Sequence, residues 1–286
     1  MSGRGAMAGR AAATGIPLLL VLASISVASC RRDAAGAPVA AGTAAAAIVV
    51  DSLGAVARAI AAHPPYEVVT VRDPGTIRGV VSMDSTRPRR DITLSDTDDT
   101  AACGRVVHDG SIETDGHGLG NALVWVSNVR RGLAPPVTRR AALAIIRCQY
   151  SPRVLALVAG TTIDFASRDD AVHHTRFVNA LDGKLLTRML TVDRWEVVPS
   201  ARIAARPGLV QVEGVRHSFA RGYVAVFANP YFAVTDRRGR FAIRGLPVGT
   251  YHVRVWHERA PVVLDRVVTV AAGRTATLDV TLTGGE

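Results

Sequence analysis

From Thr70 to its C-terminus, the chain consists of short segments rich in Val, Ile and Leu, separated by turn residues. Examples are "GTIRGVVSM", "ALVWVSNV", "YVAVF" and "TYHVRVWHE". Most alternate between apolar and polar residues, the period of a half-buried strand, and no segment of helical period lies between them. A chain of 286 residues is long enough for two cores. The pattern therefore predicts an all-β protein made of two β-sandwiches.

The N-terminus has the pattern of an export signal. Basic residues and no acid precede the apolar segment "IPLLLVLASISVAS", which is short for a membrane span. The segment ends in "VASC", which resembles a bacterial lipobox. That resemblance implies a lipoprotein signal peptide over residues 1–29, a diacylated Cys30 and, because Arg31 follows, an outer-membrane address on the periplasmic or surface face. The alternative is an ordinary signal peptide cleaved near Ala28.

Two further segments precede the strands. Residues 30–48 are of low complexity and Ala-rich, which predicts a tether. Residues 49–74 predict one short helix and a lead-in, since Asp51 can cap a helix whose apolar stripe includes Val56 and Ile60. The "HPP" at 63–65 should end it.

The chain has three cysteines, an odd number for an exported protein. If Cys30 carries lipid, Cys103 and Cys148 are left as a pair in an oxidising compartment. We therefore expect a disulfide between them, the alternative being two buried thiols.

Charge and motifs exclude several function classes. The net charge is +10, but Lys184 is the single lysine among 34 basic residues, and the arginines are scattered without interleaved aromatics. This pattern disfavours nucleic-acid binding. Nucleotide-binding, zinc-protease and serine-hydrolase motifs are absent from the sequence, so we expect no enzyme.

Residues 229–258, "NPYFAVTDRRGRFAIRGLPVGTYHVRVWHE", resemble the carboxypeptidase regulatory-like domain, a small β-sandwich. We place this domain at 229–286 and allow it to borrow strands from 75–82. The family is architecturally similar to starch-binding domains, so exposed aromatic residues could stack on sugar rings; the candidates are Tyr223, Tyr231, Phe232 and Tyr251. The alternative is that these rings pack in the core.

Residues 75–228 resemble a cupredoxin-like Greek-key sandwich, through "RVLALVAGTTIDFASRDDAVHHTRF" and "HSFARGYVAVF". The resemblance makes His173 and His217 the histidine ligands of a copper site. The thiolate position is Gly214 and the thioether position is Ala220, and no cysteine follows residue 148. A blue-copper electron-transfer site needs that thiolate, so the ligand chemistry excludes one.

Two imidazoles remain, with Asp169, Asp170 or Glu213 near them in the sequence. Such a set could bind Cu(II) or Zn(II) weakly, or the histidines could be inert remnants of the fold. The function that we favour is a non-catalytic, membrane-anchored envelope lipoprotein with a protein or glycan partner and a degenerate copper site. The alternatives are a carbohydrate-binding module and weak copper or zinc handling.

Overall fold

The computed structural model describes residues 42–49, 53–84, 91–95, 97–260 and 262–284, which all belong to one compact unit. The predicted signal peptide, the lipidated Cys30 and the helix cap Asp51 lie outside the described residues. Strands dominate, as expected for an all-β protein. Among the described residues, no helix is long and apolar enough to cross a membrane.

One sandwich, which we call the outer sandwich, is formed by strands from both ends of the described chain. Its first sheet has the order β1-β22-β21-β8-β19, and its second has the order β20-β3-β7-β6, with β23 and β24 parallel to β3. The strands are β1 (Gly42–Val49), β3 (Gly75–Met83), β6 (Thr114–Asp115), β7 (Gly118–Leu119), β8 (Leu123–Val126), β19 (Phe232–Val234), β20 (Arg240–Leu246), β21 (Gly249–Trp256), β22 (Val262–Val270), β23 (Thr275–Thr277) and β24 (Val280–Leu282). Alternate residues of these strands, such as Ile77, Ile243 and Val253, fill the core between the sheets.

The other sandwich, which we call the inserted sandwich, lies between β8 and β19 in the sequence. Its sheets have the orders β11-β10-β13-β16 and β12-β18-β17-β14-β15. The strands are β10 (Arg140–Ile146), β11 (Gln149–Ser151), β12 (Val154–Val158), β13 (Thr162–Ser167), β14 (His173–Asn179), β15 (Leu190–Val192), β16 (Val197–Ser200), β17 (Gly208–Gly214) and β18 (Arg221–Phe227). Phe165 and Phe177 meet edge to face at 5.6 Å in its core, where both are fully buried.

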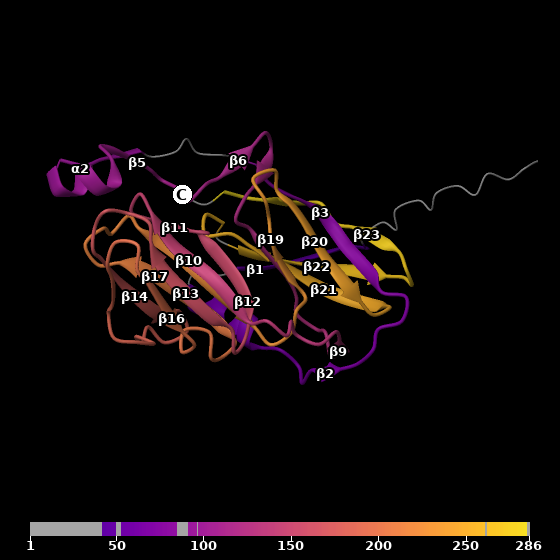
Figure 1. Ribbon diagram of the computed structural model, residues 1–286. Helices are drawn as coiled ribbons and strands as arrows, with labels where there is room; N and C mark the ends of the chain where they lie inside the picture. Colours follow the sequence, from indigo (N-terminus) through magenta and orange to yellow (C-terminus); the bar gives the residue numbers. More distant parts are fainter. Residues whose placement is uncertain (1–41, 50–52, 85–90, 96, 261, 285–286) are drawn as a thin grey trace, which may run out of the picture. The chain divides into compact units, whose positions relative to one another are not determined.

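We allowed the domain at 229–286 to borrow strands from 75–82, and the strand pairing also includes residues 123–126 of the predicted 75–228 domain. Gly75–Met83 pairs with Arg240–Leu246, and Leu123–Val126 pairs with both β19 and β21. Figure 1 shows β3, in purple, beside β20, in orange. We therefore propose that residues 75–126 belong with 232–282, and that the second sandwich is inserted into the first.

Three smaller features complete the fold. The predicted helix is present as α1 (Leu53–Ala61), with Val56 and Ile60 buried. A second helix, α2 (Thr97–Cys103), was not predicted; it precedes the small pair of β4 (Asp91–Thr93) and β5 (Val106–His108). β2 (Glu67–Val68) pairs with β9 (Arg131–Gly132).

The predicted tether at 30–48 needs correction, because Gly42–Val49 forms β1 and pairs with β22. Backbone hydrogen bonds along the edge of β22 need no particular side chain, so an Ala-rich stretch can supply them. The absence of large apolar residues therefore did not reveal this strand.

The two sandwiches share a hydrophobic cluster with α1. Val56 and Ile60 of the helix pack with Trp125 and Trp256 of the outer sandwich and with Tyr223 of the inserted one. The Tyr223 and Trp256 rings meet edge to face at 5.3 Å. Close beside them, Arg153 and Glu258 form an ion pair between the two sandwiches, and their side chains are only 11% and 6% exposed.

His257 makes folding sensitive to acid. The side chain is fully buried, and burial together with the neighbouring Arg153 lowers its pKa from 6.5 to about 4. Between pH 6.5 and about 4, His257 is protonated in the unfolded chain and neutral in the folded chain. The unfolded state is therefore favoured as the pH falls through this range, and the stability present above pH 6.5 is lost.

We predict that His257→Asn removes most of this sensitivity. Between pH 7.5 and 4.5, the wild type should lose about 2.5 kcal/mol more unfolding free energy than the variant, as measured by urea denaturation. The exposed His117 provides the control, since His117→Asn should keep the wild-type pH profile. Parallel pH profiles for wild type and His257→Asn would contradict the prediction.

Candidate functional site

The two predicted ligand histidines lie together at one end of the inserted sandwich. His173 opens β14, and His217 lies in the loop between β17 and β18. The two rings are 6.0 Å apart between centroids, and both side chains are buried. Because β14 and β17 are hydrogen-bonded neighbours, the loop after Gly214 is brought beside the start of β14.

Asp169 fixes the orientation of His173. The imidazole Nε2–H donates to Asp169 Oδ2 at 2.9 Å, and the carboxylate also accepts the backbone N–H groups of Arg147 at 2.5 Å and Cys148 at 2.8 Å. Burial would raise the pKa of Asp169, but the bonds from His173 and the two amides outweigh it and lower this pKa. Asp169 is thus an ionised anchor for both the histidine and the 147–148 turn.

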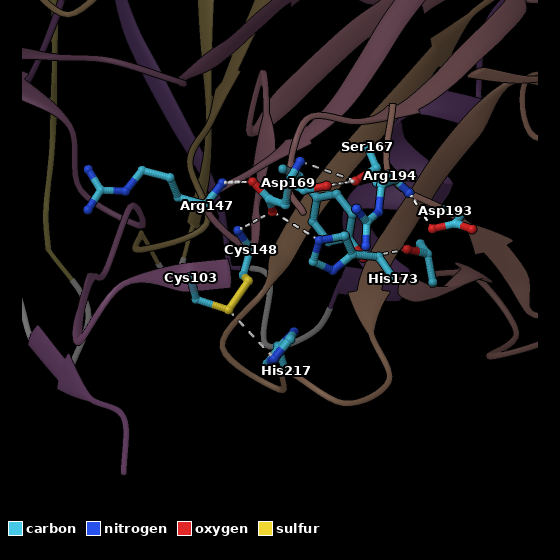
Figure 2. A network of polar contacts seen from close by, with 11 residues as sticks. Cys103, Arg147, Cys148, Ser167, Asp169, His173, Asp193, Arg194 and His217 are labelled. Carbon is cyan, nitrogen blue, oxygen red and sulfur yellow. Dashed lines mark hydrogen bonds and ion pairs between the residues drawn. A yellow bond between two sulfur atoms is a disulfide. The ribbon is translucent and has the colours of Figure 1, made fainter. Parts of the chain in front are cut away.

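The predicted disulfide between Cys103 and Cys148 is confirmed, with Cα atoms 5.1 Å apart. Its position was not predicted: Cys103 Sγ lies 3.7 Å from His217 Nε2. Figure 2 shows the disulfide next to His217, and Asp169 between the 147–148 turn and His173. The disulfide therefore joins α2 to the histidine pair.

There is no room for a side chain at Gly214, the position that the sequence resemblance predicted for the thiolate. A Cβ at Gly214 would lie 2.7 Å from the His217 carbonyl oxygen and 3.0 Å from the Ala220 Cβ. Two backbone bonds tighten the same loop, Gly214 N–H to Ala220 O at 3.0 Å and Ala220 N–H to His217 O at 2.9 Å. A cysteine at 214 would therefore clash with this loop unless the loop moved.

Little space remains between the two histidines. The cavity that they line with Cys148, Tyr150 and Thr175 has a volume of about 10 Å³. Since one water molecule needs at least about that volume, a substrate has no room there. The groups at this site can bind a proton or a small ion, but they cannot enclose an organic molecule.

Comparison with known proteins locates one family in the chain. Residues 222–283 match the carboxypeptidase regulatory-like domain family. The match begins within β18 and covers β19 to β24 of the outer sandwich, which we now call the regulatory-like sandwich. No curated protein matches the chain.

Among solved structures, the chain is similar to a purple cupredoxin from Nitrosopumilus maritimus, with 19% identity over 30% of this chain and 98% of that chain and a TM-score of 0.26. A mutant of amicyanin has 19% identity over 30% of this chain and 81% of its own, with a TM-score of 0.27. A copper-containing nitrite reductase from Thermus scotoductus SA-01 has 17% identity over 33% of this chain and 23% of its own, with a TM-score of 0.27.

The predicted sugar-stacking aromatics do not form an exposed platform. Tyr223, Tyr231 and Tyr251 are buried, and Phe232 stacks on Phe227 at 4.6 Å. Tyr231 donates to Gly245 O at 2.9 Å, at the bulge of β20, and Tyr251 donates to Pro247 O at 2.8 Å, in the turn after β20. The core-packing alternative fits these four residues, because their aromatic faces are used inside the protein.

A larger, polar cleft of about 520 Å³ has lining residues from both sandwiches. Its charged groups bond to each other or to nearby residues: Arg237 pairs with Glu113 at 2.6 Å, and Arg153 pairs with Glu258. These pairings neutralise the charges that an ionic ligand would need.

Proposed function

We propose that the protein is a non-catalytic binding module of the cell envelope, anchored through Cys30, which binds a protein partner through the surface around Trp195. The observation that carries the proposal is the state of Trp195. Its side chain is 62% exposed although its backbone is left-handed, with φ of 58°. A bulky residue in this conformation costs about 1–2 kcal/mol, and such cost is often kept where a residue has a function.

The inserted sandwich, which carries Trp195, has several exposed apolar residues. Of the fourteen large hydrophobic residues that are exposed in the described part of the chain, seven lie between residues 172 and 215 of the inserted sandwich. They are Val172, Leu181, Leu185, Met189, Trp195, Val197 and Val215. Of these seven, Val172 lies next to the Trp195 turn, because His173 pairs with Val192, whereas Leu185 bridges Val178 toward the other end of β14. Tryptophan is enriched among residues that dominate binding energy, so Trp195 is the residue on which the proposal rests.

The turn that carries Trp195 is held in place from both sides. Asp193 N–H donates to Glu196 Oε2 at 3.0 Å, and Arg194 pairs with Asp170 at 2.8 Å. Ser167 N–H donates to Glu196 O at 3.2 Å, which connects the turn to β13. A tryptophan on a fixed turn loses little freedom on binding, which favours affinity.

The histidine site supports the non-catalytic part of the proposal. By the resemblance in the sequence, Gly214 and Ala220 stand where a copper site would need sulfur. The disulfide contacts His217, and Asp169 bonds to His173. In contrast, nothing in the geometry favours the carbohydrate-binding alternative, since three of its four aromatic candidates are buried.

The binding surface is tested by site-specific photo-crosslinking of the full chain in cells. A photoreactive phenylalanine at Val197, which is 51% exposed, should give one defined crosslinked protein, and Trp195→Asn in the same chain should abolish it. Asparagine tolerates the left-handed backbone, so folding should persist. The same probe at the fully exposed Val137 is the control. Equal crosslinking at 137 and 197, or a crosslink indifferent to Trp195→Asn, would contradict the proposed surface.

The anchor is tested separately by membrane fractionation. We expect the wild type in the membrane fraction and Cys30→Ala in the soluble one, whereas a Cys30→Ala protein that stays with the membranes would contradict the lipid anchor.

A further inference from the structure

We propose that reduction of the Cys103–Cys148 disulfide creates a metal site for a thiophilic ion, Zn²⁺ foremost, with the two thiolates and His217 as ligands and the fourth from the Asp169–His173 pair. This inference does not depend on the proposed partner surface. The site would use the sulfur atoms of Cys103 and Cys148, which come from α2 and from the 147–148 turn. The predicted copper-ligand positions, Gly214 and Ala220, carry no sulfur.

The ligand atoms are already close together. The sulfurs of Cys103 and Cys148 and a ring nitrogen of His217 all lie within 4.8 Å of one another. The same limit holds for a second group, formed by Cys148, Asp169 and His173. Cys148 belongs to both groups, so one ion beside its sulfur can reach ligands from each.

The required rearrangement is small. Two ligands of a tetrahedral zinc ion, each about 2.0–2.3 Å from the metal, lie about 3.5–3.8 Å apart. Cys103 Sγ and His217 Nε2 are 3.7 Å apart and already meet this spacing. The two sulfurs must separate, which breaking their bond permits, and the fourth ligand must approach from its place within 4.8 Å of the Cys148 sulfur.

The turn that bears Cys148 does not depend on the disulfide for its shape. Arg147 and Cys148 have left-handed backbones, with φ of 51° and 60°, and both amides donate to Asp169. These bonds remain when the disulfide is reduced, so Cys148 stays beside His173. The carboxylate on the His173 imidazole is also the usual arrangement by which proteins orient a metal-binding histidine.

The chemistry balances with a dithiol as the reductant. A thiolate of the dithiol attacks one sulfur of the protein disulfide and forms a mixed disulfide, which frees the other cysteine. The second thiol of the dithiol then attacks its own sulfur in the mixed disulfide and frees the second cysteine. Two electrons and two protons pass to Cys103 and Cys148, and the dithiol leaves as its own disulfide. Zn²⁺ binding then displaces the two thiol protons. Thiolate and imidazole ligands select Zn²⁺ or Cu⁺ over Mg²⁺ and Ca²⁺.

The test is a Zn²⁺ titration of the full chain, oxidised or reduced with a phosphine that does not bind zinc, against a chromophoric chelator. We expect one Zn²⁺ per reduced chain, bound at least 100-fold more tightly than by the oxidised chain. His217→Ala and Cys148→Ser should each weaken binding at least 10-fold, and His117→Ala, at an exposed histidine, should not. Co²⁺ as a second probe should show thiolate-to-metal charge transfer in the reduced chain alone.

Two results would overturn the proposal. One is equal Zn²⁺ affinity of the oxidised and reduced chains, and the other is equal affinity of reduced wild type and His217→Ala. If reduction unfolds the protein, near-ultraviolet circular dichroism decides: Zn²⁺ should restore the wild-type signal and fail to restore that of His217→Ala. Recovery in both variants, or in neither, would also overturn it.

Discussion

Replacing both cysteines of the disulfide with alanine, in Cys103→Ala/Cys148→Ala, is expected to lower the free energy of unfolding by about 4 kcal/mol. The crosslink closes a loop with a sequence separation of 45 residues and so lowers the conformational entropy of the unfolded chain. Removing the crosslink restores that entropy and favours unfolding. The two side chains are also fully buried with Val107, so the loss of sulfur atoms adds a small packing cost. Urea denaturation at neutral pH measures the change.

The wild type serves as its own control for this prediction. Addition of a reductant should lower its stability by a similar amount, and the same reductant should leave the double alanine variant unchanged. A variant within 1 kcal/mol of the oxidised wild type would show that the loop is closed by other contacts. Under the metal-site proposal, Zn²⁺ should recover part of the loss in the reduced wild type and none in the variant.

Glu258→Ala should be the second strongly destabilising substitution, at about 3–5 kcal/mol. Arg153 donates two hydrogen bonds to Glu258, from Nε to Oε1 and from Nη2 to Oε2, the second at 2.8 Å. Removing the carboxylate leaves a guanidinium that is only 11% exposed without its charge partner. The energy arises from the buried charge that is left behind more than from the bond that is lost.

Two further variants separate these causes. Arg153→Met/Glu258→Leu removes both charges and should recover most of the stability, because no buried charge remains. Asp164→Ala breaks the Arg140–Asp164 pair, whose arginine is 60% exposed, and should cost less than about 1 kcal/mol. If the double variant is as unstable as Glu258→Ala, the packing of these side chains matters more than their charge.

Local patterns were sufficient to predict the fold class and the helix at 53–61. Alternation along segments such as Gly249–Trp256 specifies a strand with one buried face, and this is a property of neighbouring residues. The same alternation contains no information about which strand is the neighbour. The family resemblance allowed for the strand at 75–82, but the pairing of β8 with β19 and β21 joins residues far apart in the sequence and was not predicted.

The candidate site was predictable in its parts and not in its assembly. The cysteine count predicted the disulfide, and the resemblance of the loops predicted His173 and His217. That the disulfide contacts His217 depends on α2, which has no clear apolar stripe, and on a left-handed turn at 147–148 made of arginine and cysteine. Neither residue type signals such a turn in the sequence.

The proposed insertion would determine the order in which the chain can assemble. Strands β3 and β8 leave the ribosome before the whole inserted sandwich, and their partners β19 to β22 follow it. The inserted sandwich can therefore close while the regulatory-like one is still incomplete, because domains tend to fold as units in the order of synthesis. Val124 and Ala233 face each other across neighbouring strands, so the folded insert returns the chain to the place where it left. If the inserted sandwich folds first, it therefore holds β19 next to its partner β8 before the rest of the outer sheet is complete.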